Sequence, residues 1–367
     1  MTIPRRTIVD GARAAMRALA DRSTPLIRNE WYVAAFAHEV GRTLLRRTLL
    51  GTSLVLFRTT TGLPVAMDNR CPHRSYPLSS GHLDGDTLAC GYHGMRFDTE
   101  GNCIELPAIA KCPKGIGVRT YPVVEKGAIC WIWMGAQDPD LNRIPAPHWM
   151  ADSDWAGADA YYHLAGSYVS LHENLLDTSH LSFLHAKTIG SPDYVRAPTT
   201  IEISDGRFAL NRLVYPTRLP EALVKLTGLD ATADVVRAVR NEFLAPGYYE
   251  ATTLLYDKAR DAADRPEFSI RVAHMPTPET LTSTHYFIYV ARNFAQTDAL
   301  SHRVMVKNML SAFEEDVIGL AMQEDMQRAA GNDLYEVSFE SDALTIAMRR
   351  YLKLRANAEQ LPAEPPR

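Results

Sequence analysis

Short runs of apolar and β-branched residues, separated by glycine and threonine, fill the first third of the chain. Each run has the length and composition of a β-strand, and the breaks at Gly51 and residues 60–62 have the composition of turns. We therefore expect an all-β region here. Its strands are predicted at residues 31–35, 52–57, 63–66, 115–124 and 128–134.

The remainder of the chain combines two periodicities. Apolar residues recur at helical spacing over residues 169–184, 304–328 and 341–358. Strand-like runs occupy residues 248–256, 268–274 and 282–292. This mixture predicts an α+β protein, in which an all-β domain precedes a domain with an antiparallel β-sheet flanked by helices.

A proline-rich stretch at residues 138–148 interrupts the strand pattern, and we place a domain boundary there. Alanine and arginine dominate residues 5–22, which predicts a surface helix. The expected organisation is an N-terminal helical extension (1–26), a first domain (27–142) and a second domain (143–367). We expect the end of the chain, from residue 359, to be frayed.

Composition excludes several kinds of partner. The chain has 367 residues, a net charge of −4 and 46% hydrophobic residues, so no electrostatic feature predicts binding to nucleic acid or an anionic membrane. The longest apolar stretches, 128–135 and 286–291, fall short of the roughly 20 residues of a membrane-spanning helix. The first residues lack the apolar core of a secretory signal, so we expect a cytoplasmic protein without a membrane anchor.

Five cysteines, an odd number, do not suggest a disulfide framework. Cys71 and Cys90 each have a histidine two or three residues further on. Cys103, Cys112 and Cys130 have no nearby histidine and are predicted to be buried thiols.

The two Cys-His pairs have the pattern of a Rieske centre. Cys71 and His73 form one pair, and Cys90 and His93 form the other, with residues 74–89 between them. In a Rieske [2Fe–2S] cluster two thiolates hold one iron and two imidazoles hold the other. A zinc site is the alternative, but zinc fingers usually separate their cysteines from their histidines along the chain, so the order here favours the cluster.

A second group of polar residues follows in the predicted helix 169–184. Asn174, Asp177 and His180 recur at three-residue steps and would share one helical face. His185 lies five residues after His180, so the helix must end or distort before both imidazoles reach one metal ion. A carboxylate is available at Glu314, Glu315 or Asp316, in a segment predicted to open a long helix, and these three acids are equally able on sequence grounds.

Two histidines and one carboxylate would form the facial triad of a non-haem Fe(II) oxygenase. Zinc hydrolases can use the same ligands, and a single interior histidine needs no metal. A Rieske motif earlier in the chain disfavours both alternatives, because a zinc ion or a core histidine has no use for its electrons.

From about residue 29 to about residue 350 the chain resembles the Rieske non-haem iron oxygenase family. The resemblance includes NEWYV at residues 29–33, the segment 71–97 and AICWIWMG at residues 128–135. Members commonly have tryptophan where this chain has Met95, a position beside the cluster. The family's catalytic domain has a helix-grip, START-like fold.

The resemblance also implies roles for residues. Cys71, His73, Cys90 and His93 would hold the [2Fe–2S] cluster, and His180, His185 and Asp316 would hold one Fe(II). Asn174 and Asp177 would be catalytic residues beside the iron, with Asp177 accepting hydrogen bonds from a cluster histidine and an iron-binding histidine. The family keeps the two centres of one subunit too far apart for efficient electron transfer, which implies a head-to-tail homotrimer, alone or stacked as a hexamer, in which His93 faces Asp177 of the next subunit.

The expected reaction uses O2 and a small aromatic substrate. No glycine fingerprint for NAD or FAD is present, so a separate NAD(P)H reductase, with or without a ferredoxin, would supply electrons. The chain is most similar to the vanillate demethylase and dicamba monooxygenase branch, which implies hydroxylation or O-demethylation of an aromatic acid. The alternatives are ring dihydroxylation, as in the phthalate dioxygenase branch, and an electron-transfer protein without oxygenase activity.

The substrate pocket is expected between strand residues 254–256, 270–274 and 285–292, because alternate side chains of a strand point inward. Candidate anchors for a substrate carboxylate are Arg271, His274, His285 and Arg292.

Overall fold

The computed structural model describes residues 14–21, 23–109, 115–204, 206–217, 219, 221–229 and 235–360. It divides into two compact units. The smaller unit comprises Arg28–Ala151 with Thr277–Thr280, and the larger comprises Met1–Ile27, Asp152–Pro276 and Leu281–Arg367. Residues 14–20 are helical, as expected, but residues 21 and 23–26 are not, so the predicted helical extension ends earlier than expected; residues 1–13 and 22 lie outside the described residues.

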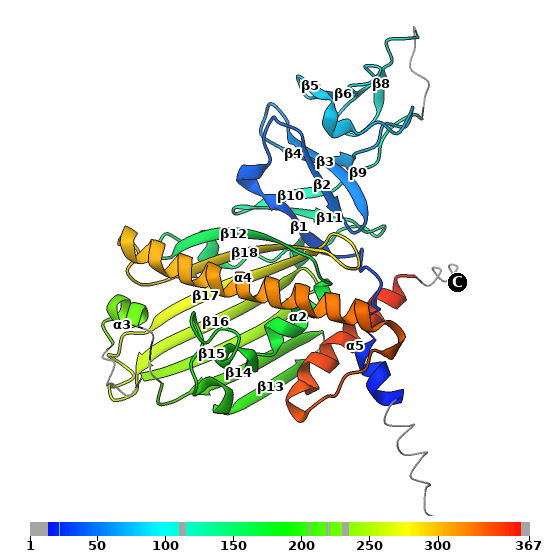
Figure 1. Ribbon diagram of the computed structural model, residues 1–367. Helices are drawn as coiled ribbons and strands as arrows, with labels where there is room; N and C mark the ends of the chain where they lie inside the picture. Colours follow the sequence, from blue (N-terminus) through cyan, green and yellow to red (C-terminus); the bar gives the residue numbers. More distant parts are fainter. Residues whose placement is uncertain are drawn as a thin grey trace, which may run out of the picture. The chain divides into compact units, whose positions relative to one another are not determined.

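The smaller unit consists of three antiparallel β-sheets (Figure 1). The first contains β1 (Trp31–Phe36), β11 (Ile129–Trp133) and β10 (Val123–Lys126). The second contains β2 (Leu45–Leu49), β3 (Thr52–Arg58), β4 (Pro64–Asp68) and β9 (Thr120–Tyr121). The third contains β5 (His82–Asp84), β6 (Thr87–Ala89), β7 (Arg96–Phe97) and β8 (Cys103–Glu105). The unit also contains four short 3₁₀ turns among its described residues: η1 (Ala37–Glu39), η2 (Leu78–Ser80), η3 (Leu141–Arg143) and η4 (His148–Met150).

Four of the predicted strands in this unit are confirmed, because β1, β3, β4 and β11 occupy the expected segments. The prediction for residues 115–124 was too long: only β9 and the start of β10 are extended there. Strands of two or three residues, such as β6 and β7, were missed because so few residues produce no alternation.

The larger unit is built on a seven-stranded antiparallel sheet in the order β12-β18-β17-β16-β15-β14-β13. Its strands from β13 to β18 form a meander, and β12 pairs with β18 at one edge. The strands are β12 (Ala156–Leu164), β13 (Thr199–Ser204), β14 (Arg207–Val214), β15 (Val235–Ala245), β16 (Tyr248–Asp257), β17 (Phe268–Pro278) and β18 (Thr284–Arg292).

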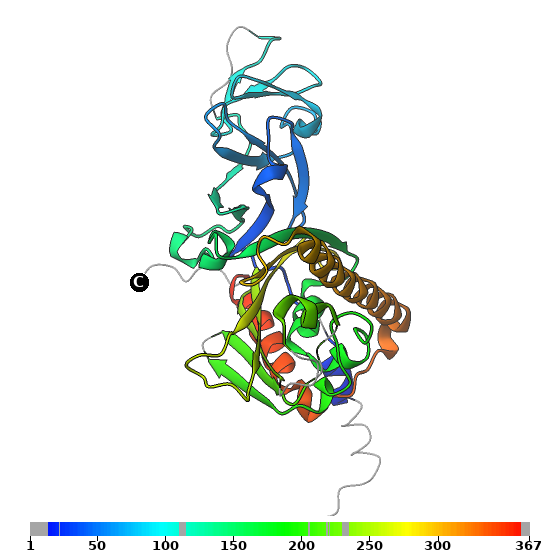
Figure 2. The ribbon, with the colours of Figure 1, turned by 90° about the vertical axis from the view of Figure 1, so that its left-hand side faces the viewer.

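Helices cover one face of this sheet (Figures 1 and 2). They are α2 (Tyr168–Leu176), α4 (Ala299–Ala330) and α5 (Ala343–Ala358), with the shorter α3 (Glu221–Thr227) near the ends of the strands. Apolar side chains of the helices and of the inner sheet face form one core, in which Leu175, Phe243, Tyr286, Phe313 and Met348 are buried. The opposite sheet face has ion pairs, such as Arg240 with Glu202 and Glu242. The predicted α+β architecture is confirmed.

The 3₁₀ turns of this unit are η5 (Ser179–Ser182), η6 (Tyr194–Arg196), η7 (Gly331–Asp333) and η8 (Glu340–Asp342). No helix among the described residues is long and apolar enough to cross a membrane.

Two helix predictions need correction. Residues 169–184 are not one helix, because α2 ends at Leu176, where Asp177 has extended backbone angles, and η5 follows as a separate turn. The long helix does not begin beside Glu314. It begins at Ala299, so Glu314, Glu315 and Asp316 lie in its middle, and a favourable first-turn helix dipole does not account for these acids.

Candidate functional site

Two loops of the smaller unit present the Cys-His pairs with matching backbone geometry. Cys71 N donates to Tyr76 O, and Cys71 O accepts from Ser75 N. Cys90 N donates to Met95 O, and Cys90 O accepts from Gly94 N. The partners are therefore five and four residues beyond each cysteine in both loops.

The fourth residue after each cysteine has a left-handed backbone, with φ of 57° at Ser75 and 71° at Gly94. Glycine adopts this conformation without strain, which accounts for Gly94. Gly91 serves a different purpose: a Cβ there would lie 2.6 Å from Ser80 O, so only glycine permits this approach of the two chain segments.

The four side chains divide by burial. Cys71 and Cys90 are buried in an apolar cluster with Phe57, Leu88 and Phe97, whereas His73 and His93 are exposed. The two imidazole rings lie 4.7 Å apart between centroids. Two inner thiols and two outer imidazoles on paired loops fit the donor set of a Rieske [2Fe–2S] cluster.

Met95 lies at the inner end of this site. It is buried, and its sulfur is 3.9 Å from that of Cys71. Burial, together with the neighbouring Cys90 thiol, raises the pKa of the Cys71 thiol. In the absence of a metal ion the apolar surroundings therefore favour the neutral thiol.

Of the other cysteines, Cys130 is a buried free thiol, as predicted. The prediction for Cys103 was wrong, since this residue is half-buried and disulfide-bonded. Cys112 lies outside the described residues.

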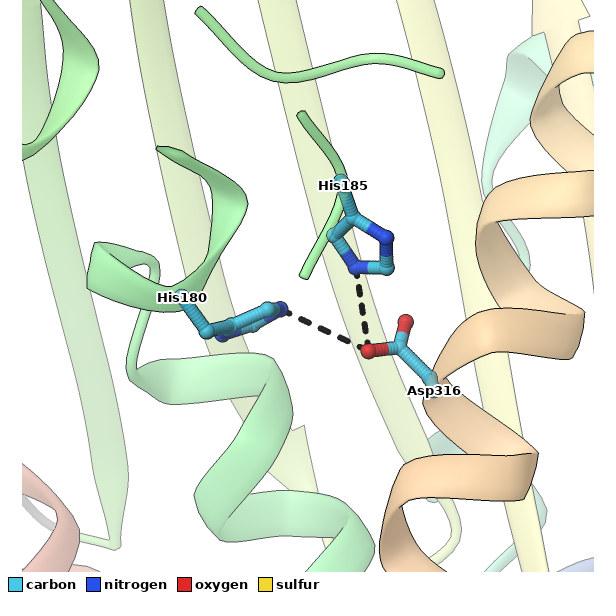
Figure 3. Close-up of side chains that lie close together, drawn as sticks. All are labelled: His180, His185 and Asp316. Carbon is cyan, nitrogen blue, oxygen red and sulfur yellow. Dashed lines mark hydrogen bonds and ion pairs between the residues drawn. The ribbon is translucent and has the colours of Figure 1, made fainter. Parts of the chain in front are cut away.

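The second candidate site joins three segments of the larger unit. His180 comes from η5, His185 from the loop after it, and Asp316 from the middle of α4 (Figure 3). One ligand atom from each lies within 4.8 Å of the others. Nε2 of His185 is 3.0 Å and Nε2 of His180 is 3.5 Å from Asp316 Oδ1. The break between α2 and η5 lets both imidazoles point to one place.

The far nitrogen of each imidazole has a hydrogen-bond acceptor. His180 Nδ1 contacts the main-chain carbonyl of Asp177, and His185 Nδ1 lies 2.8 Å from Glu315 Oε2. These acceptors favour the tautomer with hydrogen on Nδ1, which leaves both Nε2 lone pairs free for a metal ion. The donor set fits a mononuclear metal centre.

The three consecutive acidic residues 314–316 of α4 have different surroundings. Glu314 is exposed, Glu315 contacts His185 and Thr188, and Asp316 is buried. Burial alone would raise the pKa of the Asp316 carboxyl, but hydrogen bonds from His180 and His185 lower it below its usual range. Asn174 Nδ2 also donates to Asp316 Oδ1 over 2.9 Å.

Asp177 lies beside this centre without joining it. Its Oδ1 accepts a hydrogen bond from Ser179 N over 2.8 Å, and it lines a polar pocket together with Asn174 and His180. The contact with His180 runs through the Asp177 main-chain carbonyl, at the place where the resemblance implies the carboxylate.

A largely apolar cavity of about 140 Å³ opens at the three residues. An apolar cavity of about 150 Å³ is known to accept benzene, so this one has room for a single aromatic ring. Apolar residues that line it include Leu175, Leu181, Val239, Ile270, Met305 and Phe313.

Only some of the expected pocket residues line this cavity. Strand β17 contributes Ile270, Val272 and His274, as predicted, but β16 contributes Ala251 and Thr253 rather than residues 254–256. Of the four candidate anchors, His274 alone lines the cavity. Arg271 faces the other side of the sheet and pairs with Glu250, His285 contacts the Tyr161 hydroxyl, and Arg292 contacts Ala295 O.

The sequence pattern did not predict that residues of β15 line the cavity. Arg237, Val239 and Asn241 all line the cavity. Their alternation was the available signal, but arginines at positions 237 and 240 interrupt the apolar pattern.

Comparison with known proteins agrees with this geometry. The Rieske [2Fe-2S] domain family matches residues 30–122, and the vanillate O-demethylase oxygenase C-terminal domain family matches residues 164–358. The iron–sulfur subunit of the toluene-4-sulfonate monooxygenase system of Comamonas testosteroni is 32% identical over 79% of this chain and 86% of its own.

Dicamba O-demethylase, oxygenase component, of Stenotrophomonas maltophilia is 31% identical over 92% of this chain and 99% of its own length. The crystal structure of dicamba monooxygenase bound to 3,6-dichlorosalicylic acid superposes with a TM-score of 0.85, at 27% identity, over 93% of this chain and all of that one.

Fold and sites together define an oxidoreductase that couples a [2Fe–2S] cluster to a mononuclear iron and incorporates O2. The chain belongs to the Rieske non-haem iron oxygenase components that carry the vanillate O-demethylase type of C-terminal domain.

Proposed function

We propose that this chain is the terminal oxygenase of a multicomponent system that hydroxylates or O-demethylates a small aromatic acid. In this proposal Cys71, His73, Cys90 and His93 hold the cluster, and His180, His185 and Asp316 hold the iron. One observation carries it: two histidines and a buried carboxylate converge in the lining of an apolar cavity with room for one aromatic ring.

The cofactors would supply reductive activation of O2, with one electron from the cluster and one from the iron. The protein's own residues orient the participants. Glu315 and the Asp177 carbonyl hold the two imidazoles in the tautomer that binds metal, and Asn174 restrains the Asp316 carboxylate. The apolar lining excludes bulk water from the ring of the substrate and fixes which of its carbons faces the iron.

O-demethylation is the leading reaction. Hydroxylation of a methoxy carbon gives a hemiacetal that expels formaldehyde, and the dicamba and vanillate relatives are both named for O-demethylation. Ring dihydroxylation is the second candidate, because a 3-chlorobenzoate-3,4-dioxygenase subunit is 33% identical over 45% of the chain. The same iron ligands serve both reactions, so the position of the substrate decides between them.

We also propose a head-to-tail homotrimer, alone or stacked as a hexamer. In this arrangement His93 of one subunit faces Asp177 of the next, and Asp177 links the two centres. Two features support it. His73 and His93 are exposed rather than covered, and Ile318, Met322 and Met326 form an exposed apolar stripe at four-residue spacing on α4.

A separate NAD(P)H reductase, with or without a ferredoxin, would deliver electrons to the cluster.

We place the protein in the cytoplasm and keep the domain division at residues 27–142 and 143–367 as part of the proposal. The Rieske cluster on its own could serve electron transfer, but the second metal site favours an oxygenase.

Iron and acid-labile sulfide analysis of the purified protein tests the cofactors. Turnover of methoxylated and carboxylated aromatics with a surrogate reductase then tests the reaction. Formaldehyde release supports O-demethylation, whereas a diol product replaces it with dihydroxylation. Protein that loads both cofactors yet oxidises no member of the panel and consumes no O2 contradicts the oxygenase function.

A further inference from the structure

A buried arginine lines the cavity of the candidate iron site. Arg237 lies on β15, whose residues at 235, 237, 239, 241 and 243 are all buried on the inner face of the sheet. Strand alternation therefore turns this side chain inward, and it is 9% exposed. Among the described residues that line the cavity, Arg237 alone carries a permanent positive charge.

The guanidinium of Arg237 is only partly satisfied. One Nη1 hydrogen bond reaches Ile189 O over 3.0 Å, and the Tyr194 ring lies 5.0 Å below the guanidinium carbon. Its Nε is buried without a hydrogen-bond partner, and no carboxylate of the described residues forms an ion pair with it. A buried guanidinium that lacks hydrogen-bond partners and an ion pair destabilises the fold unless an anion binds to it.

Arg240, the neighbouring arginine on the same strand, differs from Arg237 in its ion pairs. Arg240 points to the outer face of the sheet, where it pairs with Glu202 at 3.0 Å and Glu242 at 3.2 Å. The outward arginine thus has two carboxylates, while the inward one has none. The other polar side chains of β15 and β17 at the cavity are engaged: Asn241 donates to Leu175 O, and His274 Nδ1 contacts the Tyr286 hydroxyl.

We propose that Arg237 is a specificity-determining residue that binds an oxyanion, a carboxylate or a sulfonate, on the aromatic substrate. This inference rests on the proposed function and assigns the anion-binding group of its site. The planar guanidinium can offer two parallel N–H donors to an oxyanion, and the apolar surroundings strengthen that contact. The aromatic ring then lies against the apolar lining of the cavity, which His180, His185 and Asp316 of the candidate metal centre also line.

A purely structural role predicts something different. The Ile189 carbonyl that Arg237 contacts lies in the turn after His185, where Thr188 N and Gly190 N both donate to His185 O. Were Arg237 only a support for that turn, its loss would disturb iron binding and every ligand alike. Were it an anion site, its loss would affect charged ligands and spare neutral ones of the same shape.

The experiment measures binding without turnover. Under anaerobic conditions, calorimetry gives Kd values of the iron-loaded protein for 4-methoxybenzoate, 4-methoxybenzenesulfonate and the neutral 4-methoxybenzamide. Arg237→Gln should weaken one or both anions by about 10- to 100-fold and change the amide less than about twofold. The two anions distinguish a carboxylate from a sulfonate site. Arg240→Gln, the outward control, should change none of the three.

Equal weakening of all three ligands, or of none, overturns the inference. Should Arg237→Gln fail to fold, Arg237→Lys replaces it: the charge stays but the planar fork is lost, so the anions should weaken severalfold and the amide should not, whereas equal effects contradict the proposal. Iron content and cluster absorption of the same wild-type samples separate the two hypotheses. Absence of the iron or of the cluster contradicts the proposed function. Protein that contains both cofactors but shows no preference for the anions contradicts only the role of Arg237.

Discussion

Glu315 accepts a hydrogen bond from Nδ1 of His185 over 2.8 Å, while Nε2 of the same ring lies 3.0 Å from Asp316. Adjacent residues of α4 thus contact both nitrogens of one imidazole. Thr188 donates to the same Glu315 oxygen over 2.9 Å, which further restrains the carboxylate. Glu315, a rival of Asp316 as metal ligand in the sequence, lies on the far side of the ring and acts on its orientation and basicity.

We therefore predict that Glu315→Ala lowers iron affinity about 10- to 100-fold, because loss of such a partner frees the ligand's tautomer and orientation. Iron retention against a graded chelator measures it. Glu314→Ala is the matched control, since Glu314 is the exposed neighbour on the same helix and should have no effect. Equal iron retention in the two variants would remove Glu315 from this role.

Loss of the two cofactors should be separable. Cys71→Ala or His93→Ala should abolish the visible absorption of the cluster, because a missing ligand exposes one of its irons, and leave one iron per chain in the larger unit. His180→Ala should do the reverse, keeping the cluster spectrum while abolishing turnover. An unchanged spectrum after Cys71→Ala refutes the Rieske assignment, and turnover near the wild-type rate after His180→Ala excludes that ligand.

Much of the candidate cluster site could be predicted from sequence because its proposed ligands are local. Each Cys-His pair lies within one short loop, and spacing together with glycine already specifies the geometry. Other strands of the same unit, such as β1 and β11, are continuous apolar runs that are recognisable without knowledge of their partners.

The second site depended on information that the sequence does not contain. The family resemblance implied Asp316, but the residue pattern alone could not separate it from Glu314 and Glu315 until the start of α4 and its rotation relative to the sheet were known. Arg237 was missed for a similar reason: which side of a strand faces inward depends on register, and a charged residue at an inward position mimics a surface strand. Arg271, one of the predicted anchors, lies on the sheet face that points away from the cavity, which also depends on the register of the strand.

We expect a buried histidine outside both sites to make the larger unit sensitive to acid. His172 on α2 is fully buried, with Nε2 3.0 Å from Pro246 O, and burial lowers its pKa to about 4. The unfolded chain takes up this proton near its ordinary pKa of about 6.5, whereas the folded chain does so only near 4. The stability contributed by the neutral ring is therefore complete above pH 6.5 and is lost as pH falls towards 4, by about 3 kcal/mol.

His172→Gln keeps a donor for the carbonyl but does not titrate. We expect the melting temperature of the wild type to fall more steeply than that of this variant between pH 7 and pH 4.5. His163→Gln, at an exposed histidine of the same unit, should keep the wild-type slope. Parallel pH profiles for wild type and His172→Gln would show that this ring does not govern the acid sensitivity.

The final prediction concerns electron transfer through Asp177. Asp177→Asn removes the charge and nearly preserves the shape. The contact of His180 with Asp177 uses the main-chain carbonyl, so it survives the substitution, and both cofactors should still load. Transfer from the cluster to the iron should nevertheless collapse, because in the proposed trimer the Asp177 carboxylate is the group that links His93 of the neighbouring subunit to the iron site. In a single turnover of reduced protein with O2 and substrate, the cluster should stay reduced and little product should form.

Subunit mixing then tests whether this transfer crosses between chains. Asp177→Asn subunits keep all four proposed cluster ligands, and His93→Ala subunits keep Asp177. In the proposed homotrimer, each variant alone should therefore be inactive for a different reason. In a mixed ring, some interfaces pair an intact cluster of one subunit with an intact Asp177 of its neighbour. Co-expression of the two variants should therefore restore part of the activity, and differently tagged subunits purified in sequence isolate the mixed rings. If such rings form and load iron but remain inactive, electrons do not pass between subunits at this contact and must reach the iron within one chain.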